Sequence, residues 1–293
     1  MNERWSIRRI GKTLQLGAQV VSKVMDQNHI PKRNDREQAL KYTCNESFFS
    51  SIQTEQQAYW LGFLYADGYI LPQRRGVGVT LAATDKGHLI KFEEDVEFNG
   101  HIHQYHASPG AYSSNDYARI QIISPQLADD LIKLGCVPNK TKILKFPMAD
   151  QVPERLLRHF SRGFIDGNGS VQLCLPPNKA PEIAVKATGT KEVMLGLLRV
   201  FKCEHLKLSS RHHGRANNYS ITCGGNIQAL RILDFLYKDA TVYLERKYLK
   251  YLQCKEEYQK FIESSRLKTG GVKAREPQLQ EGVRQHGVLT GEA

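Results

Sequence analysis

The sequence lacks the features that mark membrane, secreted and zinc-scaffold proteins. It has no run of about 18 apolar residues, the length that a membrane-spanning helix needs. Its charged N-terminus is followed by no apolar block of the secretory kind. Its 6 cysteines include no C-x-x-C pair, which argues against a zinc module and a disulfide framework. We expect a cytoplasmic chain with reduced thiols and no membrane partner.

Acidic residues are also scarce. Asp and Glu number 30 against 41 Lys and Arg, which gives a formal net charge of +11. Such a balance favours an anionic partner, either nucleic acid or a charged membrane surface. Hydrophobic residues make up 41% of the chain and charged residues 24%, which excludes wholesale disorder. With 293 residues the chain can form two hydrophobic cores of ordinary size.

The N-terminal region predicts two short helices with a turn between them. Residues three and four apart mark a helix over 6–14, and Gly17 can cap a second one. The expected buried stripe of the second helix is Val20, Val21 and Val24. The pattern resembles the helix-turn-helix of many phage and bacterial DNA-binding proteins, in which outward residues meet DNA. Those residues are Gln19, Ser22 and Lys23. A plain helical hairpin stays an alternative.

Two long segments that follow look like copies of one another. Thr54 and Gln57 form a capping box, which predicts a helix over 55–66. Pro153 favours the first turn of a helix over 154–165. Further patterns recur in the same order after both helices. They predict strands at 77–84, 119–123, 183–188 and 219–223, and helices at 89–98, 126–134, 193–201 and 227–237.

This order predicts an α+β fold of two helix-strand-strand-helix-strand-strand-helix repeats. We expect a helix-turn-helix region and linker over 1–44, a first repeat over 45–150 and a second repeat over 151–263. The remaining residues, 264–293, are polar, Gly-rich and almost free of large apolar side chains. They are expected to form a disordered tail.

Small residues recur every four positions along the first helix of each repeat. They are Ala58, Gly62 and Ala66 in one copy and Gly163 and Gly167 in the other. Two such stripes can pack backbone to backbone, which would bring the acidic residues at the helix ends together. Carboxylates of this kind suit Mg²⁺ and the hydrolysis of phosphodiesters. A purely structural helix pair that ends in Asp-Gly turns stays an alternative.

Residues 60–68 (WLGFLYADG) and 161–169 (SRGFIDGNG) resemble the two nine-residue signatures of double-motif LAGLIDADG homing endonucleases. The resemblance implies two pseudo-symmetric αββαββα repeats that form a saddle over double-stranded DNA with a long target site. It further implies a monomeric, site-specific endonuclease that uses Mg²⁺ or Mn²⁺. An intron or a free-standing mobile element would encode it, and in a bacterial or phage setting it would work at the nucleoid.

The resemblance makes the last acidic position of each signature a metal ligand and catalytic residue. That position is Asp67 in the first copy but Asn168 in the second, whose amide oxygen can ligate a cation without supplying charge. Asp166 could substitute only if the helix end is rearranged. The second centre is therefore expected to be weak or dead. This leaves open double-strand cutting, nicking, or binding without cleavage, as a DNA-binding regulator or as a maturase on intron RNA.

The resemblance also implies a basic residue beside each centre, which would polarise solvent or stabilise charge on the phosphate. Lys140 and Lys247 hold matching places in the two repeats. Polar residues that alternate along the strands would carry base readout. They are Arg119, Gln121, Gln172, Lys186, Arg211 and Arg215. Any half-solvated sheet shows such alternation, and we interpret His101, His103 and His106 as surface residues in the same way.

Overall fold

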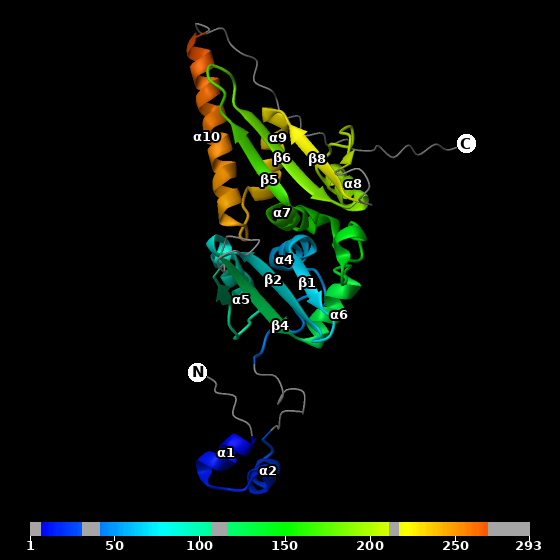
Figure 1. Ribbon diagram of the computed structural model, residues 1–293, viewed down its shortest axis with the longest axis vertical. Coiled ribbons are helices and arrows are strands. Elements are labelled where there is room, and N and C mark those ends of the chain that lie inside the picture. The colour runs from blue at the N-terminus through cyan, green and yellow to red at the C-terminus, as the bar shows by residue number, and fades with distance from the viewer. Residues whose placement is uncertain (1–6, 31–41, 107–115, 211–216, 269–293) are drawn as a thin grey trace, which may run out of the picture.

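The structure, a computed structural model, describes residues 7–30, 42–106, 116–210 and 217–268. Two short helices, α1 (Ile7–Leu14) and α2 (Ala18–Gln27), precede two larger units that stand one above the other in Figure 1. The long helix α10 (Glu245–Lys268) follows the second unit and lies along its sheet. This succession of helices and strands confirms the predicted α+β class.

The two larger units have the same order of elements. The first consists of α4 (Glu55–Ala66), β1 (Gly68–Leu71), β2 (Gly76–Ala82), α5 (Lys86–Asp95), β3 (His103–Tyr105), β4 (Tyr117–Ile123) and α6 (Pro125–Lys133). The second consists of α7 (Leu157–Asn168), β5 (Gly169–Cys174), β6 (Glu182–Gly189), α8 (Lys191–Val200), β7 (Ser209–Ser210), β8 (Tyr219–Gly224) and α9 (Asn226–Tyr237). Both follow the predicted αββαββα order.

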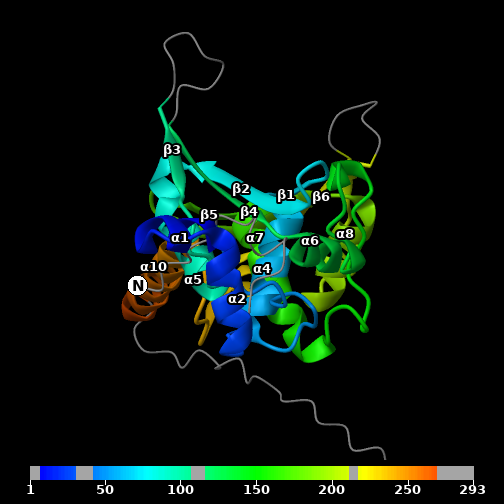
Figure 2. The same cartoon turned by 90° about the horizontal axis from the view of Figure 1, so that it is seen from below.

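Each unit folds its strands into one antiparallel sheet. The strand orders are β1-β2-β4-β3 and β5-β6-β8-β7, so corresponding strands occupy corresponding places. Figure 2 shows the helices α4, α5 and α6 on one side of the first sheet. Each sheet therefore has one face that packs on helices and one that is turned away from them, as expected of an internal duplication.

The sheet faces that meet the helices are apolar. Along β4, Ala118, Ile120 and Ile122 are buried, and the residues between them are partly exposed. This alternation fixes the register, because a slip by one residue would turn the apolar set outward. Aromatic residues of α4 and α7 join the same core. They include Trp60, Phe63, Phe160 and Phe164.

The first helices of the two repeats begin differently. At α4 the predicted capping box is present: the Gln57 amide donates to Thr54 Oγ1 at 3.2 Å, and the Thr54 amide donates to Gln57 Oε1 at 3.0 Å. In the second repeat Pro153 precedes a 3₁₀ turn (Glu154–Leu156), so α7 begins at 157 instead of the predicted 154. It also continues to 168, beyond the predicted end at 165, which places Asp166 inside the helix.

The helices α1 and α2 approach closely at Gly11. A Cβ atom on Gly11 would lie 2.6 Å from the carbonyl oxygen of Leu16, so a larger residue would push the turn away. Gln15 has a φ of 55°, the left-handed conformation that glycine usually supplies. The chain thus forms the tight turn between α1 and α2 with a glutamine in the left-handed conformation.

The buried stripe predicted for α2 is wrong at two of its three positions. Val21 is buried, whereas Val20 and Val24 are 48% and 46% exposed. The reason is that α1 covers only the Val21 side of α2. The candidate DNA contacts are exposed or partly exposed and stay a prediction; they are Gln19, Ser22 and Lys23.

Residues 264–268, which we expected to belong to the tail, are helical, because α10 continues to Lys268. Pairs one turn apart support the end of this helix, such as Lys260 with Glu256 at 2.7 Å and Gln259 with Glu263 at 2.9 Å. Residues 269–293 lie outside the described part of the chain. Within the described ranges, none of the helices is long and apolar enough to cross a membrane.

Candidate functional site

The α4 and α7 helices pack backbone to backbone between the two sheets. A Cβ atom on Gly62 would lie 2.0 Å from the carbonyl oxygen of Phe160. The contact is reciprocal, since a Cβ atom on Gly163 would lie 2.0 Å from the carbonyl oxygen of Tyr59. Ala58 between them is fully buried. Only hydrogen atoms fit at the two glycines, which explains the small-residue spacing in both signatures.

The same close packing brings the C-terminal ends of the two helices together. A Cβ atom on Gly167 would lie 2.2 Å from the Cβ atom of Ala66 and 3.4 Å from Asp67 Oδ2. Asp67 is the residue that ends α4 and is partly buried. Asn168 is the last residue of α7 and is exposed. The two positions that the signatures predict as a pair therefore lie at adjoining helix ends.

The Asp67 carboxylate is half-buried, and within the described residues no group donates a hydrogen bond to it. Burial raises its pKa, and the neighbouring Asp85 carboxylate acts in the same direction. The charges of Lys247, Lys140 and Arg246 lower it but do not offset the burial. Asp67 is thus an unbonded acid that faces three cations, an arrangement that suits a cation or solvent ligand better than a structural role.

Lys140 and Lys247 bind carbonyl oxygens at the C-terminal ends of α4 and α7 in equivalent ways. Lys247 Nζ donates to the carbonyl oxygens of Ile165, Asp166 and Gly169, each at 2.6 Å. Lys140 Nζ donates to the carbonyl oxygen of Gly68, which is the position equivalent to Gly169. Both side chains are buried, and burial lowers the pKa of both, that of Lys247 to about 8.

Lys140 and Lys247 differ in the number of hydrogen bonds that their ammonium groups donate. An ammonium group has three hydrogens, and Lys247 donates all of them to carbonyl oxygens. It acts as a fixed positive charge at the end of α7 rather than as a donor to solvent. Lys140 bonds to one carbonyl within the described residues and keeps hydrogens for water or phosphate. Sequence reasoning treated the two as equivalent, but their bonding shows different tasks.

Asp166 does not lie at the helix ends with Asp67. It is fully buried and accepts hydrogen bonds from Tyr59 Oη at 2.8 Å, Tyr237 Oη at 2.6 Å and the Leu244 amide at 2.8 Å. Burial raises its pKa, against the effect of these bonds. The hypothesis that Asp166 replaces Asn168 as a metal ligand is therefore wrong for this arrangement, because its oxygen atoms are already bonded inside the core.

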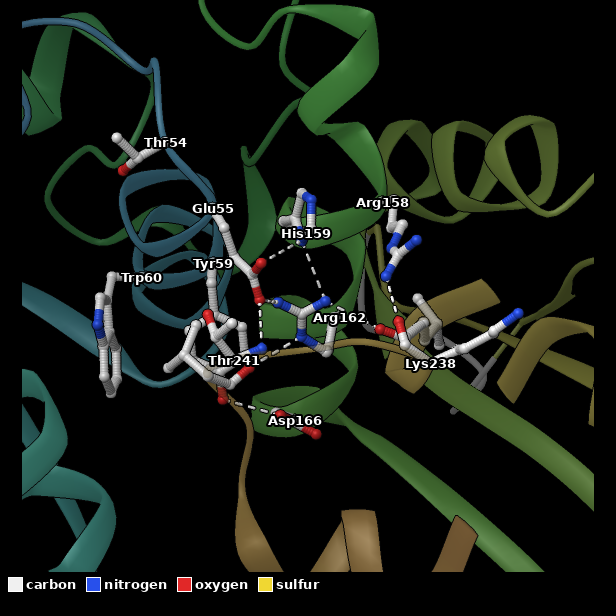
Figure 3. A network of polar contacts seen from close by, with 12 residues as sticks. Thr54, Glu55, Tyr59, Trp60, Arg158, His159, Arg162, Asp166, Lys238 and Thr241 are labelled. Atoms are coloured by element: carbon white, nitrogen blue, oxygen red, sulfur yellow. Dashed lines mark hydrogen bonds and ion pairs between the residues drawn. The ribbon is translucent and has the colours of Figure 1, made fainter. Parts of the chain in front are cut away.

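Figure 3 shows a buried ionic network that joins the two repeats next to the α4–α7 contact. Arg162 is fully buried and donates to Glu55 Oε1 at 2.6 Å and to the carbonyl oxygens of Leu236 and Val242 at 2.9 Å. Glu55, at the start of α4, also accepts from the Thr241 amide at 2.8 Å. The network attaches the segment before α10 to both central helices. It thereby fixes the helix that carries Lys247.

Sequence reasoning did not find this network. The one available signal is that Arg162 stands in the second signature where the first has Leu61. A charged residue on an otherwise buried helix predicts a buried partner, because an unpaired buried charge is strongly destabilising. The identity of the partner, Glu55, could not be read from the sequence, since it lies 107 positions away.

His88 lies next to Tyr59 and its imidazole is neutral. The Tyr59 hydroxyl donates its hydrogen to Asp166 and lies 3.0 Å from His88 Nε2, so the imidazole must donate from Nε2. Its other nitrogen, Nδ1, is buried without a partner in the described residues. Burial and the charges of Lys91, Arg246 and Lys247 lower the pKa of His88 to about 3.

Acid should destabilise the fold through His88. The unfolded chain takes up a proton near pH 6.5, but the folded chain does so only near 3. The stability is therefore full above pH 6.5 and falls as the pH decreases toward 3, by up to about 5 kcal/mol. In urea unfolding at a series of pH values, His88→Gln should lose less stability than the wild type between pH 6.5 and 4. If the free energy of unfolding changed with pH in the same way in both proteins, His88 would not be the group responsible for the loss in acid.

The outward face of the first sheet is occupied by its own side chains. The Arg119 guanidinium lies 4.7 Å from the centre of the Tyr105 ring and donates a hydrogen bond to the Tyr105 hydroxyl. Gln121 Nε2 donates to Tyr69 Oη at 3.2 Å. Both of these candidate base contacts lie on the outward face, where tyrosines hold them in place.

The outward face of the second sheet is more open. Gln172 and Lys186 line a groove of about 910 Å³ together with Thr222 and with Lys250 of α10. The other candidates on this sheet, Arg211 and Arg215, lie outside the described residues. His103 of β3 and the flanking residues His101 and His106 are exposed. Among the described residues no three His, Cys, Asp or Glu side chains form a metal-binding group.

No protein-family model matches the sequence, and no curated protein matches it either. The solved structures that the chain resembles include LAGLIDADG homing endonucleases. I-LtrWI bound to target DNA has 13% identity and a TM-score of 0.48, over 76% of this chain and 93% of its own. I-AabMI bound to uncleaved DNA has 11% identity and a TM-score of 0.47, over 71% and 91%. I-GzeII in complex with a DNA target has 11% identity and a TM-score of 0.47, over 73% and 93%.

Proposed function

We propose that this chain is a DNA endonuclease that hydrolyses phosphodiester bonds at the adjoining ends of α4 and α7. The observation that carries the proposal is the unbonded Asp67 carboxylate, which faces Lys140, Lys247 and Arg246 where the two helices meet. A structural carboxylate in a half-buried position is ordinarily hydrogen-bonded. An acid without such a bond, surrounded by positive charge, suits a site at which a cation and a phosphate are bound together.

The donor set fits one hard divalent cation. Mg²⁺ is commonly held by one or two carboxylates, with water and substrate phosphates completing its coordination. Asp67 supplies one carboxylate, and the Asn168 amide oxygen is available as a neutral ligand. Bound there, Mg²⁺ or Mn²⁺ would polarise the scissile phosphate and activate water. Asp67 would balance the charge of the cation, and Lys247 would stabilise the negative charge that develops on the phosphate.

The two centres are unequal in this proposal. Asn168 brings no charge, and the nearest acid on its own helix, Asp166, is bonded inside the core. The centre that depends on Asn168 therefore holds a cation more weakly. We infer that one strand is cut first and that nicked DNA accumulates before linear DNA. Double-stranded DNA that spans both sheets is the proposed substrate, with Gln172 and Lys186 as base contacts in the groove of the second sheet.

Asn168→Asp should make the rates of the two strand cuts more alike, because it adds the carboxylate that the second centre lacks. Asn168 is exposed at the end of α7, so Asn168→Asp needs no rearrangement of the core. We expect the second-strand cut to become about 10-fold faster, which corresponds to about 1.4 kcal/mol in the activation free energy. Time courses of nicked and linear plasmid would show a smaller peak of nicked circles. An unchanged rate of the second-strand cut would contradict the assignment of Asn168 to the second centre.

Cleavage of a supercoiled plasmid library with a randomised insert tests the proposed function. The chain should convert supercoiled circles to nicked and then linear DNA in Mg²⁺ or Mn²⁺, and EDTA should stop the reaction. Binding without any cleavage in either metal would overturn the endonuclease. That outcome would favour a regulator or an intron-RNA maturase, for which the neutral Asn168 is the supporting observation.

A further inference from the structure

An ion pair crosses between the repeats next to the Asp67 centre. Arg246, in the first turn of α10, donates from Nε to both carboxylate oxygens of Asp85, at 2.9 and 3.2 Å. Asp85 ends a 3₁₀ turn after β2 in the first repeat. The Asp85 side chain is 12% exposed and that of Arg246 is 58% exposed. The pair is therefore anchored on the Asp85 side and reaches solvent on the Arg246 side.

The position of this pair is fixed by its neighbours. Arg246 directly precedes Lys247, whose ammonium group is bound to the end of α7 beside Asp67. The end of α7 adjoins Asp67, since a Cβ atom on Gly167 would lie 3.4 Å from Asp67 Oδ2, so Lys247 holds the first turn of α10 next to this carboxylate. Nε is bonded to Asp85, and within the described residues the terminal nitrogens of the guanidinium donate no hydrogen bond. A guanidinium fixed in this way matches the geometry of a phosphate group.

We propose that Arg246 is a catalytic residue that contacts the phosphodiester held at Asp67, and that Asp85 is the positioning residue that orients it. The inference rests on the proposed function and names a residue that the sequence did not suggest. Arg246 would bind the phosphate through its terminal nitrogens. Asp85 would hold the side chain in one rotamer, so that little conformational entropy is lost when DNA binds.

The second centre has no counterpart of this arginine. Lys140 and Lys247 bond to equivalent carbonyl oxygens, those of Gly68 and Gly169, so the residues before them are also equivalent. The residue before Lys140 is Asn139, which is neutral and has a left-handed backbone with φ 54°. By this equivalence the two centres differ from each other in two residues. Asp67 is combined with Arg246, whereas Asn168 is combined with Asn139.

A second cross-repeat ion pair offers a matched control. Lys91 Nζ lies 3.5 Å from Glu245 Oε2, and Glu245 directly precedes Arg246 in the first turn of α10. Neither residue is among the charges with the largest effects on the pKa of Asp67. Glu245→Gln therefore removes an exposed ion pair of the same kind from the same helix turn, and it keeps the Lys247, Lys140, Arg246 and Asp85 charges in place.

The experiment compares the wild type with Arg246→Gln, Arg246→Lys, Asp85→Asn and Glu245→Gln. Single-turnover cleavage of the plasmid recovered from the library should fall about 10²-fold in Arg246→Gln and about 10-fold in Asp85→Asn. Arg246→Lys should recover part of the loss, because it keeps the charge without the fork. Glu245→Gln should cut at the wild-type rate. The melting temperature of Arg246→Gln should match that of Glu245→Gln, because the Gln amide nitrogen is attached to Cδ, as Nε of arginine is, and can still donate to Asp85.

Binding to a mixed-sequence DNA duplex in EDTA gives a readout that does not depend on cleavage. The slope of log affinity against log salt should decrease by about 1 in Arg246→Gln, as expected for one lost phosphate contact. It should be unchanged in Glu245→Gln. If Arg246→Gln cuts at the wild-type rate, the inference is overturned while the proposed function stands. If the wild-type chain itself does not cut, both are overturned.

Discussion

Asp67→Asn should reduce DNA cleavage at least about 10³-fold, because loss of the one carboxylate in the proposed donor set removes ~4 kcal/mol of transition-state stabilisation. The reason lies in the charges around the site: without the carboxylate, three cations remain, and a divalent ion would have to bind among them. The rate of nicking of supercoiled plasmid in Mg²⁺ measures this effect directly. Asp150→Asn is a suitable control, since it removes one negative charge from an exposed position.

The same substitution should leave the fold intact or make it more stable. Burial raises the pKa of Asp67, and no described residue donates a hydrogen bond to it, so the ionised carboxylate is costly to the folded state. We expect the urea midpoint of Asp67→Asn to equal or exceed that of the wild type at neutral pH. A large loss of stability would contradict the assignment, because it would show that the carboxylate has a structural partner.

Gly62→Ala should have a large structural effect although it adds a single methyl group. The new Cβ atom would lie 2.0 Å from the carbonyl oxygen of Phe160, and that atom belongs to the backbone of the facing helix. The two helices would have to separate, at a cost of about 3 kcal/mol or more. Separation would also move Asp67 away from Asn168. We therefore expect Gly62→Ala to lose cleavage as well as stability, in thermal melts and plasmid assays.

Gly87→Ala is the matched control for this prediction. Gly87 also lies within a helix, α5, but no atom lies within 4 Å of the position that its Cβ atom would take. Alanine should stabilise that helix by about 1 kcal/mol, because it favours the helical conformation more than glycine does. If the two variants changed stability in the same direction, close packing would not be the reason for the glycine at 62.

Local sequence patterns were sufficient to predict most of the fold. The alternation along β4 and the capping box at Thr54 depend on residues that lie close together in the sequence, and both are present. The stripe of Gly62 and Ala66 predicted a close helix pair because the spacing of four places residues on one helix face. The start of α7 was predicted at 154 instead of 157. The chain forms a 3₁₀ turn after Pro153, and a helical sequence pattern cannot distinguish such a turn from a first α-helical turn.

The polar interactions of the site could not be predicted in this way. Asp166 reads as an exposed acid in an Asp-Gly turn, but its bonds to Tyr59 and Tyr237 connect segments 107 and 71 positions apart. The pair of Asp85 with Arg246 spans 161 positions. Such contacts depend on how the two repeats pack. A periodic pattern predicts only which face of a helix or strand is buried.

Strand-resolved cleavage kinetics test the central claim most directly. A duplex recovered from the plasmid library is labelled on one strand and then on the other, and each cut is timed in Mg²⁺ for the wild type and for Asp67→Asn. The account predicts that one strand is cut first in the wild type and that this first cut is lost in Asp67→Asn. Equal rates for the two strands, or a first cut that survives in Asp67→Asn, would contradict it.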